Sequence, residues 1–495
     1  MEPIRDSDIH ARIERDNPWW KSRDVKIPEA DSTRRVYFSP FKNLALNISV
    51  RRAAILLGPR RVGKTFMIKQ LVHEAIRDGF DPKGILYASI DAPIYSGLSL
   101  EKFLGFMPKA VNGTKRIVIF DEIQYFPRWE IHLKDLVDNH PDTKFIATGS
   151  AAAALKLKSQ ESGAGRFSEF MLPPLTFYEF LCFIGKDEEL VQKEKDLYHF
   201  LNIDDLNHHF LDYLNFGGYP EGVLNPEIRN NPEQFIRSDI IDKVLLKDLP
   251  NLYGIDNIQE MNRLFSFLAY NAGNEASFEN LSKGSGVSKQ TLKKYIEYLE
   301  SAFLIIKIPT VDDNCRTFLR ERNFKIYLNN PSMRAALFSP LEPHESDKIG
   351  HLAESAVFSQ WQHSSNFRHL RYARWRQGRQ EGEVDIVYLS PTNVRPVWIG
   401  EVKWSDAVMK NHQSEMKSIV HFLRKHPTLR DVVFTTKSAF HEMEIENRKI
   451  FFFPTAVYCY TVGRNITADL ERPTRIEAID SGLEQSPFDF NNKPL

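Results

Sequence analysis

The sequence predicts an α/β protein of several domains, in which two α/β regions flank a mostly helical middle region. Between residues 52 and 185, short apolar runs alternate with helical patterns, which is typical of a parallel sheet covered by helices. Residues 191–260 are charged and helical in pattern, and residues 345–465 return to mixed strands and helices. A chain of 495 residues is long enough for about three domains.

The composition is that of a folded protein without a strong overall charge. Hydrophobic residues make up 42% of the chain and the formal net charge is zero, so contact with nucleic acid would need local basic patches. Cys182, Cys315 and Cys459 are far apart, which argues against a disulfide framework or a zinc ribbon. The charged start of the chain lacks the apolar core of a signal peptide, and no apolar run approaches the ~20 residues of a membrane span. We therefore expect a cytoplasmic protein without membrane contact.

The first α/β region carries a phosphate-binding loop. The stretch GPRRVGKT fits the pattern GxxxxGK[ST], follows a buried apolar run at 53–57 and precedes a helical pattern. Its glycines let backbone N–H groups cradle phosphate oxygens at the start of that helix. We expect Lys64 to reach the outer phosphates of ATP and Thr65 to bind magnesium. The residues expected to contact ATP in this loop are Gly58, Pro59, Arg60, Arg61, Val62, Gly63, Lys64 and Thr65.

Polar residues at the ends of later apolar runs predict the rest of an ATPase site. Asp121 would bind magnesium through water and Glu122 would polarise the attacking water, unless both acids only cap a helix. Thr148 and Ser150, in IATGS, would contact the terminal phosphate, with a turn-forming Ser–Gly pair as the alternative. Arg166, in GAGRF, is a candidate arginine finger acting in cis or in trans, or else a solvated surface charge.

Residues 261–335 predict a winged helix, with three helical patterns followed by strands at 302–308 and 324–328. The third helical pattern begins with a basic stretch, whose Lys289, Lys293 and Lys294 would contact nucleic-acid phosphates. The alternative is a winged helix used only for packing between domains.

The last α/β region predicts a helix, three strands, a helix and a strand, with acids on successive elements. Strand periodicity places Glu401 and Lys403 on one face, Asp385 lies on the preceding strand, and Glu354 lies on the helix. We expect these four side chains to converge on a magnesium or manganese ion bound by Asp385 and Glu401, because carboxylates suit hard cations. The ion would activate water against a phosphodiester, with Lys403 positioning that water. The alternatives are a simple salt bridge and a nuclease-like fold of weakened or different activity.

The stretch before these strands, HSSNFRHLRYARWRQGRQ, is basic and aromatic. It holds five arginines, no acid, and the rings of Phe367, Tyr372 and Trp375. Such alternation suits phosphate contact and base stacking. The alternative is an edge strand whose charges oppose aggregation.

Taken together, these motifs resemble a prokaryotic family of AAA-type ATPases with a C-terminal domain of unknown function. The resemblance rests on GPRRVGKT, IVIFDEIQ, TGS, GGYPEGV, RSDIIDKVLLKDLPNLYGI and SKQTLKKYIEYLESAFLI. The stretch GEVDIV…GEVKW is similar to the PD-(D/E)xK nuclease fold of restriction enzymes and junction resolvases, although Val384 stands where that pattern has proline. The resemblance implies ATP hydrolysis, nucleic-acid handling and a restriction-endonuclease-like end.

These interpretations divide the chain into six segments and predict its function. We expect a magnesium-dependent ATPase coupled to DNA binding in defence or mobile-element biology, with DNA cleavage and homo-oligomer formation left open. The alternative is an ATP-driven switch whose C-terminal domain binds nucleic acid or a protein without cutting. The expected segments are an N-terminal arm (1–45), an AAA-type P-loop ATPase (46–190), a helical linker (191–260), a winged-helix domain (261–335), a PD-(D/E)xK nuclease-like domain (345–465) and a polar tail (466–495).

Overall fold

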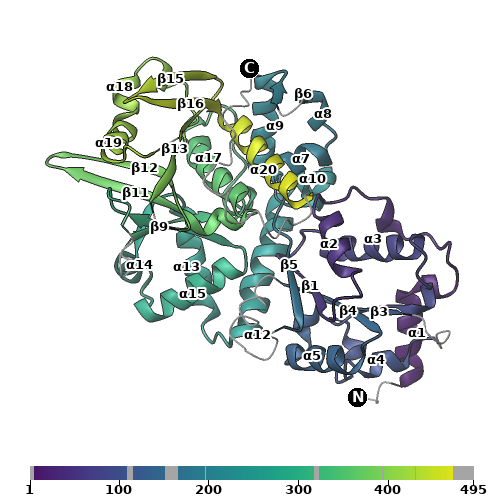
Figure 1. The fold of residues 1–495 in the computed structure, drawn as a ribbon. Helices are drawn as coiled ribbons and strands as arrows, with labels where there is room; N and C mark the ends of the chain where they lie inside the picture. Colours follow the sequence, from purple (N-terminus) through teal and green to yellow (C-terminus); the bar gives the residue numbers. More distant parts are fainter. Residues whose placement is uncertain are drawn as a thin grey trace. The chain divides into compact units, whose positions relative to one another are not determined.

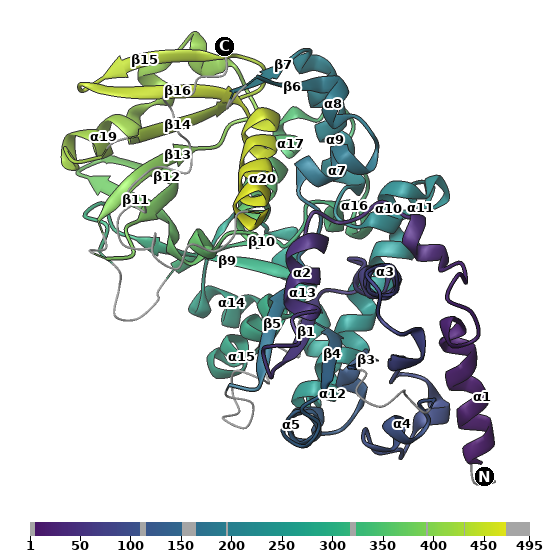
Figure 2. The same cartoon turned by 45° about the vertical axis from the view of Figure 1, so that its right-hand side comes forward.

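The computed structural model describes residues 5–108, 115–150, 165–194, 197–316, 323–392, 395–429 and 431–471. They form two compact units, drawn in Figure 1 and, turned by 45°, in Figure 2. Unit 1 runs to Pro173 and also contains Lys247–Gly254, whereas unit 2 contains Pro174–Leu246 and the chain from Ile255 onward. A short segment from the middle of the sequence therefore belongs to the N-terminal unit.

Unit 1 is built on a five-stranded sheet in which every neighbouring pair is parallel, as the sequence predicts. The strand order is β2-β3-β4-β1-β5, so the phosphate-loop strand β1 lies between β4 and β5. Strand β1 is completely buried because its side chains are apolar on both faces. The bounds are β1 Ala53–Gly58, β2 Ile85–Ser89, β3 Arg116–Asp121, β4 Thr143–Ser150 and β5 Phe167–Met171.

Helices cover both faces of this sheet, with α2 and α3 on one side and α5 on the other (Figures 1 and 2). The N-terminal segment packs on the unit through Trp19 and Trp20, whose indole N–H groups both donate to the Ile85 carbonyl at 3.0 and 2.7 Å. The bounds are α1 Asp6–Asp16, α2 Phe38–Ala45, α3 Lys64–Arg77, α4 Lys102–Gly105, α5 Trp129–Asn139 and α12 Leu249–Tyr253.

Unit 2 contains a nine-stranded mixed sheet in the order β15-β16-β14-β13-β12-β11-β9-β10-β8. Strands β9 and β11 pair in parallel, Tyr372 opposite Thr310, so the segments predicted as a winged helix and as a nuclease-like region share one continuous sheet. The hairpin β15–β16 extends the sheet beyond the strands that the sequence predicts. The bounds are β8 Glu275–Ser277, β9 Ile305–Val311, β10 Asn323–Leu328, β11 Leu370–Gln377, β12 Gln380–Leu389, β13 Pro396–Glu401, β14 Asp431–Thr436, β15 His441–Ile445 and β16 Arg448–Pro454.

The sequence predicts residues 191–260 as helical. The start of this stretch instead forms a hairpin of β6 (Val191–Glu194) and β7 (Leu197–Phe200). No helix in the described ranges is long and apolar enough to cross a bilayer. Helix α20 continues to Glu471, so the first residues of the predicted tail are helical, and residues 472–495 lie outside the described ranges. The longer helices are α7 Phe177–Phe183, α9 Ile203–Phe216, η7 Glu233–Asp242, α13 Ile258–Tyr270, α14 Phe278–Ser285, α15 Lys289–Ser301, α17 Ser346–Trp361, α19 Lys417–Lys425 and α20 Thr455–Glu471.

Candidate functional site

The phosphate loop joins the end of β1 to the start of α3, and two glycines make its shape. A Cβ atom on Gly58 would lie 2.3 Å from the Leu172 carbonyl oxygen, so only glycine allows this close approach of the backbones. Gly63 has φ +96°, a left-handed conformation that glycine adopts without steric cost. Lys64 is the first residue of α3, which directs the N–H groups of the helix start toward the loop.

The ammonium group of Lys64 lies inside the loop. Its Nζ donates to the carbonyl oxygens of Gly58 and Pro59 at 3.0 and 2.8 Å, and the residue is only 5% exposed. Burial lowers the pKa of Lys64, while the charges of Glu122 and Asp121 act in the opposite direction. Among the described residues only these carbonyl oxygens hold the buried ammonium, so it is placed to exchange them for phosphate oxygens.

Three hydroxyl groups surround the carboxylate of Asp121 at the end of β3. Thr65 Oγ1 and Tyr87 OH donate to Oδ2 at 2.9 and 2.7 Å, and Thr148 Oγ1 donates to Oδ1. The Thr65 hydroxyl and the Asp121 carboxylate are therefore neighbours, an oxygen donor set that fits Mg²⁺. The sequence offered no signal for Tyr87, because it lies on β2 and reaches Asp121 only through the pairing of β2 with β3.

The remaining polar residues predicted around the nucleotide lie at the same edge of the sheet. Glu122 has φ +54°, and its backbone N–H donates to Thr148 Oγ1 at 3.0 Å. Gln124, to which the sequence analysis assigns no role, donates to the Glu122 carboxylate and accepts from the Ser150 N–H at 3.1 Å. The Ser150 hydroxyl is buried and has no hydrogen-bond partner among the described residues. A buried hydroxyl without a partner is free to contact a ligand.

Arg166 lies away from this edge. It precedes β5 and its carbonyl accepts from the N–H of Ala53, the first residue of β1, whereas the loop follows the last residue of β1. The six residues of β1 span about 16 Å, so Arg166 does not reach the loop of its own chain. Its guanidinium instead pairs with Asp138. This placement contradicts a cis role for Arg166 and leaves the trans role untested.

Arg60, inside the loop, makes an ion pair that the sequence does not predict. Its Nε and Nη2 each lie 2.7 Å from one oxygen of Asp248, and Nη2 also donates to Tyr125 OH at 2.7 Å. Asp248 belongs to the segment Lys247–Gly254 that unit 1 incorporates. Burial opposes the charge on Arg60, but the bond to Asp248 raises its pKa. The loop is therefore tied to a segment almost 190 residues later in the chain.

In unit 2 the structure brings together the four residues that the sequence predicts as a cluster. Lys403 Nζ lies 2.7 Å from Glu401 Oε1 and 3.5 Å from Asp385 Oδ2. The backbone N–H of Val402 donates to Asp385 Oδ2 at 2.9 Å. Glu354, on α17, approaches the same group, and its charge acts on Lys403 and Glu401 after burial and the charge of Asp385.

A second lysine, Lys325 of β10, enters the cluster. Its Nζ pairs with Glu383 and lies 3.5 Å from Glu354 Oε2 and 3.7 Å from Asp385 Oδ1. Tyr327 OH donates to Glu354 Oε2 at 2.8 Å. Neither of these β10 residues is predicted from the sequence, because only the pairing of β9 with β11 brings β10 into this sheet.

The acids of this cluster differ in how readily they ionise. Burial and the charge of Asp385 raise the pKa of Glu354 to about 7 and that of Glu401 to about 8. Burial acts in the same direction on Asp385, but Lys403 and Lys325 outweigh it and lower that pKa. One carboxylate is thus held as the anion, while the pKa values of the other two lie at or above neutral pH.

The arrangement does not fit the divalent metal site predicted from the sequence. Within the described ranges, no three His, Cys, Asp or Glu side chains are placed to hold a metal ion. The physical reason is that ammonium groups from Lys325 and Lys403 lie between the carboxylates. The oxygen donors suit a hard cation, and Glu401 Oε2 is buried without a partner in this part of the chain. The donors are therefore present, but their geometry is that of an ion-pair network.

The basic and aromatic strand β11 does not offer its rings for base stacking. Trp375 is 4% exposed and stacks on His421 with ring centroids 4.1 Å apart, and Tyr372 is fully buried. Arg374 pairs with Glu275 and Glu383. The predicted stacking role is therefore contradicted for Tyr372 and Trp375, because the sheet buries one on each face.

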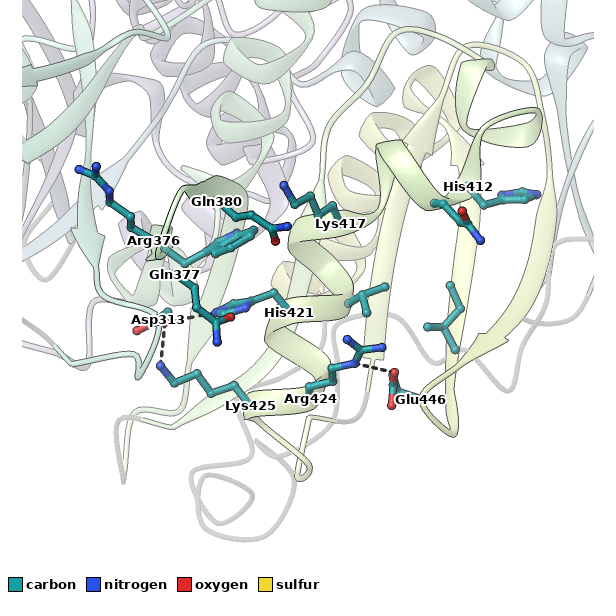
Figure 3. A pocket seen from close by; sticks show the side chains of 14 residues that line it. Asp313, Arg376, Gln377, Gln380, His412, Lys417, His421, Arg424, Lys425 and Glu446 are labelled. Carbon is teal, nitrogen blue, oxygen red and sulfur yellow. Dashed lines mark hydrogen bonds and ion pairs between the residues drawn. The ribbon is translucent and has the colours of Figure 1, made fainter.

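A basic groove nevertheless lies beside β11, next to α19 (Figure 3). Its cavity has a volume of about 940 Å³. Lys425 and His421 pair with Asp313, and Arg424 pairs with Glu446. Arg376 and Lys417 also line the groove, and within the described residues neither has a carboxylate at ion-pair distance. The other polar lining residues are Gln377, Gln380, His412 and Gln413.

The helices predicted as a winged helix are present as α13, α14 and α15, followed by β9 and β10. Ser288 caps α15 by accepting from the Thr291 N–H at 3.2 Å. Lys289, Lys293 and Lys294 are exposed near the start of α15. Lys289 is 3.8 Å from Glu279, and Lys293 lies over the Phe278 ring at 5.5 Å.

Comparisons with known proteins agree with an AAA-type N-terminal region. Residues 50–181 match the model of an AAA domain, and residues 207–344 match a domain of unknown function (DUF8612). An uncharacterized protein of Methanocaldococcus jannaschii is 24% identical over 275 residues, covering 53% of this chain and 58% of that protein. An uncharacterized protein of Haemophilus influenzae is 26% identical over 290 residues, covering 57% of this chain and 68% of that protein. This chain therefore contains an AAA-type domain with a parallel-sheet P-loop fold, as the resemblance implied.

Solved structures show a weaker likeness. A RuvB mutant of Thermotoga maritima has a TM-score of 0.29 at 16% identity, covering 58% of this chain and 93% of that chain. AMPPCP-bound DnaA from Aquifex aeolicus has a TM-score of 0.26 at 14% identity, covering 53% and 86%. TM-scores of this size carry no argument about the function of this chain.

Proposed function

We propose that the protein hydrolyses ATP at the phosphate loop of unit 1 and that the nucleotide controls binding of nucleic acid by unit 2. The observation that carries the ATPase proposal is the contact of Thr65 with Asp121 at 2.9 Å, which joins the loop to the strand-end acids. Lys64 would bind the outer phosphates, and Glu122 would polarise the attacking water. Thr65 and Asp121 would hold Mg²⁺, which neutralises phosphate charge when it is bound.

The ATPase proposal is tested by two matched variants. Lys64→Ala removes the ammonium inside the loop, and tight ATP binding should be lost in a titration with a fluorescent ATP analogue. Glu122→Gln keeps the size of the side chain and leaves Asp121 intact, so ATP should still bind while turnover falls by ~10²-fold or more. Near-normal turnover by Glu122→Gln would show that this residue does not polarise the water.

Nucleic-acid binding, with DNA favoured, is supported by the basic groove and the exposed lysines of α15. Arg376 and Lys417 line the groove and have no ion-pair partner within the described ranges, so phosphate groups are suitable counter-ions for them. The segment 261–335 is proposed as a winged helix in which Lys289, Lys293 and Lys294 add phosphate contacts. If this segment serves only for packing, these lysines make no contact with nucleic acid.

DNA cleavage is a second candidate function, with Glu354, Asp385, Glu401 and Lys403 as the proposed catalytic residues and 345–465 as the nuclease-like region. The contact of both Asp385 and Glu401 with Lys403 favours it. The ion-pair network in the same place favours the alternative of a switch that binds without cutting. Labelled DNA incubated with ATP and Mg²⁺ or Mn²⁺ distinguishes them. Cleavage that Asp385→Ala and Lys403→Ala each remove, with ATP hydrolysis retained, would establish the nuclease.

A homo-oligomer is proposed from the place of Arg166. This residue lies at the opposite end of β1 from the loop of its own chain, so an arginine finger at this position would serve a neighbouring protomer. Arg166→Ala should then lower ATP turnover without weakening ATP binding. Mixing the Arg166→Ala protein with the Glu122→Gln protein should give oligomers in which some sites combine an intact Glu122 with Arg166 of a neighbouring protomer. These mixed oligomers should recover part of the ATPase activity. A monomer in sedimentation with ATP would exclude this role.

A further inference from the structure

The ion-pair network of unit 2 contains a cation that belongs to none of the sequence motifs. Lys325 lies on β10 and is 5% exposed. Its Nζ contacts Glu383, Glu354 and Asp385, each within 4 Å. Burying an ammonium group this deeply is favourable only when anions surround it. The carboxylates of the cluster therefore have an internal counter-ion.

We propose that Lys325 is the resident cation of this carboxylate cluster and that it keeps divalent metal ions out. The proposal rests on the second candidate function, DNA cleavage, and describes how that site would be controlled. In this form the protein is a latent nuclease, and a metal ion enters only when Lys325 leaves the carboxylates.

The positions of the Asp385 oxygens support this competition. Oδ1 faces Lys325 at 3.7 Å, while Oδ2 accepts from the Val402 N–H and lies near Lys403. A divalent cation binds carboxylate oxygens at about 2.0–2.6 Å. On the side of Oδ1 that faces Lys325, an ion at that distance would lie between Oδ1 and Nζ, so this position cannot hold both cations.

An independent feature indicates that the cluster retains unused capacity for a cation. Glu401 Oε2 is buried with no hydrogen-bond partner among the described residues, and the Glu401 side chain is only 9% exposed. A buried acceptor without a partner is costly. This oxygen is therefore a donor of the kind that hard cations bind.

The strand that carries Lys325 provides a means of controlling its contact with the carboxylates. Strand β10 is paired with β9 and β8, within the segment that carries α13, α14 and α15. Asp385 lies on β12, two strands farther along the same sheet from β9. A ligand that shifts β10 would therefore change the cation in the cluster without contacting the acids themselves.

Binding of Mn²⁺ to the full chain without nucleotide tests the proposal. Lys325→Met removes the ammonium and keeps most of the side-chain volume, and we expect Mn²⁺ to bind at least about tenfold more tightly than to the wild type by calorimetry. Lys325→Arg keeps the charge and should bind as weakly as the wild type. Lys293→Met removes an exposed lysine elsewhere in unit 2 and should also leave the affinity unchanged.

Adding Asp385→Asn to Lys325→Met assigns the ion to the cluster, because the gain in affinity should then disappear. Far-ultraviolet circular dichroism checks folding, and Lys325→Gln, which can still donate to Glu383, replaces Lys325→Met if that variant unfolds. Equal, Asp385-dependent affinities in the wild type and Lys325→Met would overturn the proposal while leaving the metal site standing. Absence of Asp385-dependent Mn²⁺ binding in every protein would overturn both the proposal and the nuclease candidate.

Discussion

Breaking the ion pair between Arg60 and Asp248 should destabilise unit 1 by about 2 kcal/mol. The pair is bidentate, with both N–O distances 2.7 Å, and the side chains are 19% and 2% exposed. Removing one partner of a fully buried pair costs about 3–5 kcal/mol, because the other charge stays buried and unpaired. Exposed pairs contribute about 0–1 kcal/mol. Since Arg60 keeps some contact with solvent and with Tyr125, Asp248→Asn should fall between these limits.

A double-mutant cycle separates the pair from other effects of each substitution. Asp248→Asn and Arg60→Met should each destabilise unit 1, and the double variant should be less destabilised than the sum of the two by about 2 kcal/mol. The urea dependence of hydrogen exchange in peptides from β1 and α3 reports on this unit alone. A coupling energy below about 0.5 kcal/mol would refute the argument that this pair ties the loop to the segment Lys247–Gly254.

The same unit offers a matched control, since Arg166 and Asp138 also form an arginine–aspartate pair. Their side chains are 43% and 36% exposed, so solvent screens the interaction. The cycle of Arg166→Met with Asp138→Asn should give a coupling energy under about 1 kcal/mol. Equal coupling in both pairs would show that burial does not set the strength of the Arg60 pair.

Three further measurements probe the phosphate loop, the carboxylate cluster and the basic groove. Gly58→Ala places a Cβ atom 2.3 Å from the Leu172 carbonyl oxygen, and it should cost about 1–3 kcal/mol of stability and weaken ATP binding, as a thermal melt and a nucleotide titration would show. Burial and Asp385 raise the pKa of Glu354 to about 7 and of Glu401 to about 8 from an ordinary 4.5. The stability gained from their protonated forms should therefore be lost as pH rises from about 4.5 to about 8, and the double glutamine variant should lack this loss in urea titrations at each pH. Arg376→Gln with Lys417→Gln should weaken DNA binding and reduce the slope of log affinity against log salt, measured by fluorescence anisotropy, by roughly 0.9 for each phosphate that the variant no longer neutralises. An unchanged slope would exclude the groove as the phosphate-binding surface.

Local sequence determined the phosphate loop and the parallel sheet around it. The residues from Gly58 to Thr65 are contiguous, and a strand, a glycine-rich turn and a helix start need only their own backbone to form this loop. The acids at the end of β3 were predictable for a related reason. A buried apolar run followed by Asp121 identifies the carboxyl edge of a parallel sheet, where β1 also ends.

The order of elements in the C-terminal region was also predictable, because the periodicity of a helix or strand depends only on the residues within it. It was harder to predict from the sequence which side chains of this sheet are buried. The strand β11 alternates basic and aromatic residues, and that pattern fits both a nucleic-acid surface and a strand packed on two faces. Only the packing of α19 against Trp375, and the bond from Tyr372 to Glu275 at 2.8 Å, decided that these rings are internal.

Tertiary structure alone supplied the polar partners that complete each site. The sequence predicts no role for Asp248, Tyr87 or Lys325, because they reach Arg60, Asp121 and Asp385 only through strand pairing and chain crossing. A sequence pattern shows where a carboxylate or an arginine lies along one element, but the charge that faces it depends on which elements become neighbours. The sequence thus determined a phosphate loop and a set of converging acids, whereas the fold decided that a lysine, and not a preformed metal site, lies among those acids, because the pairing of β9 with β11 carries β10 to them.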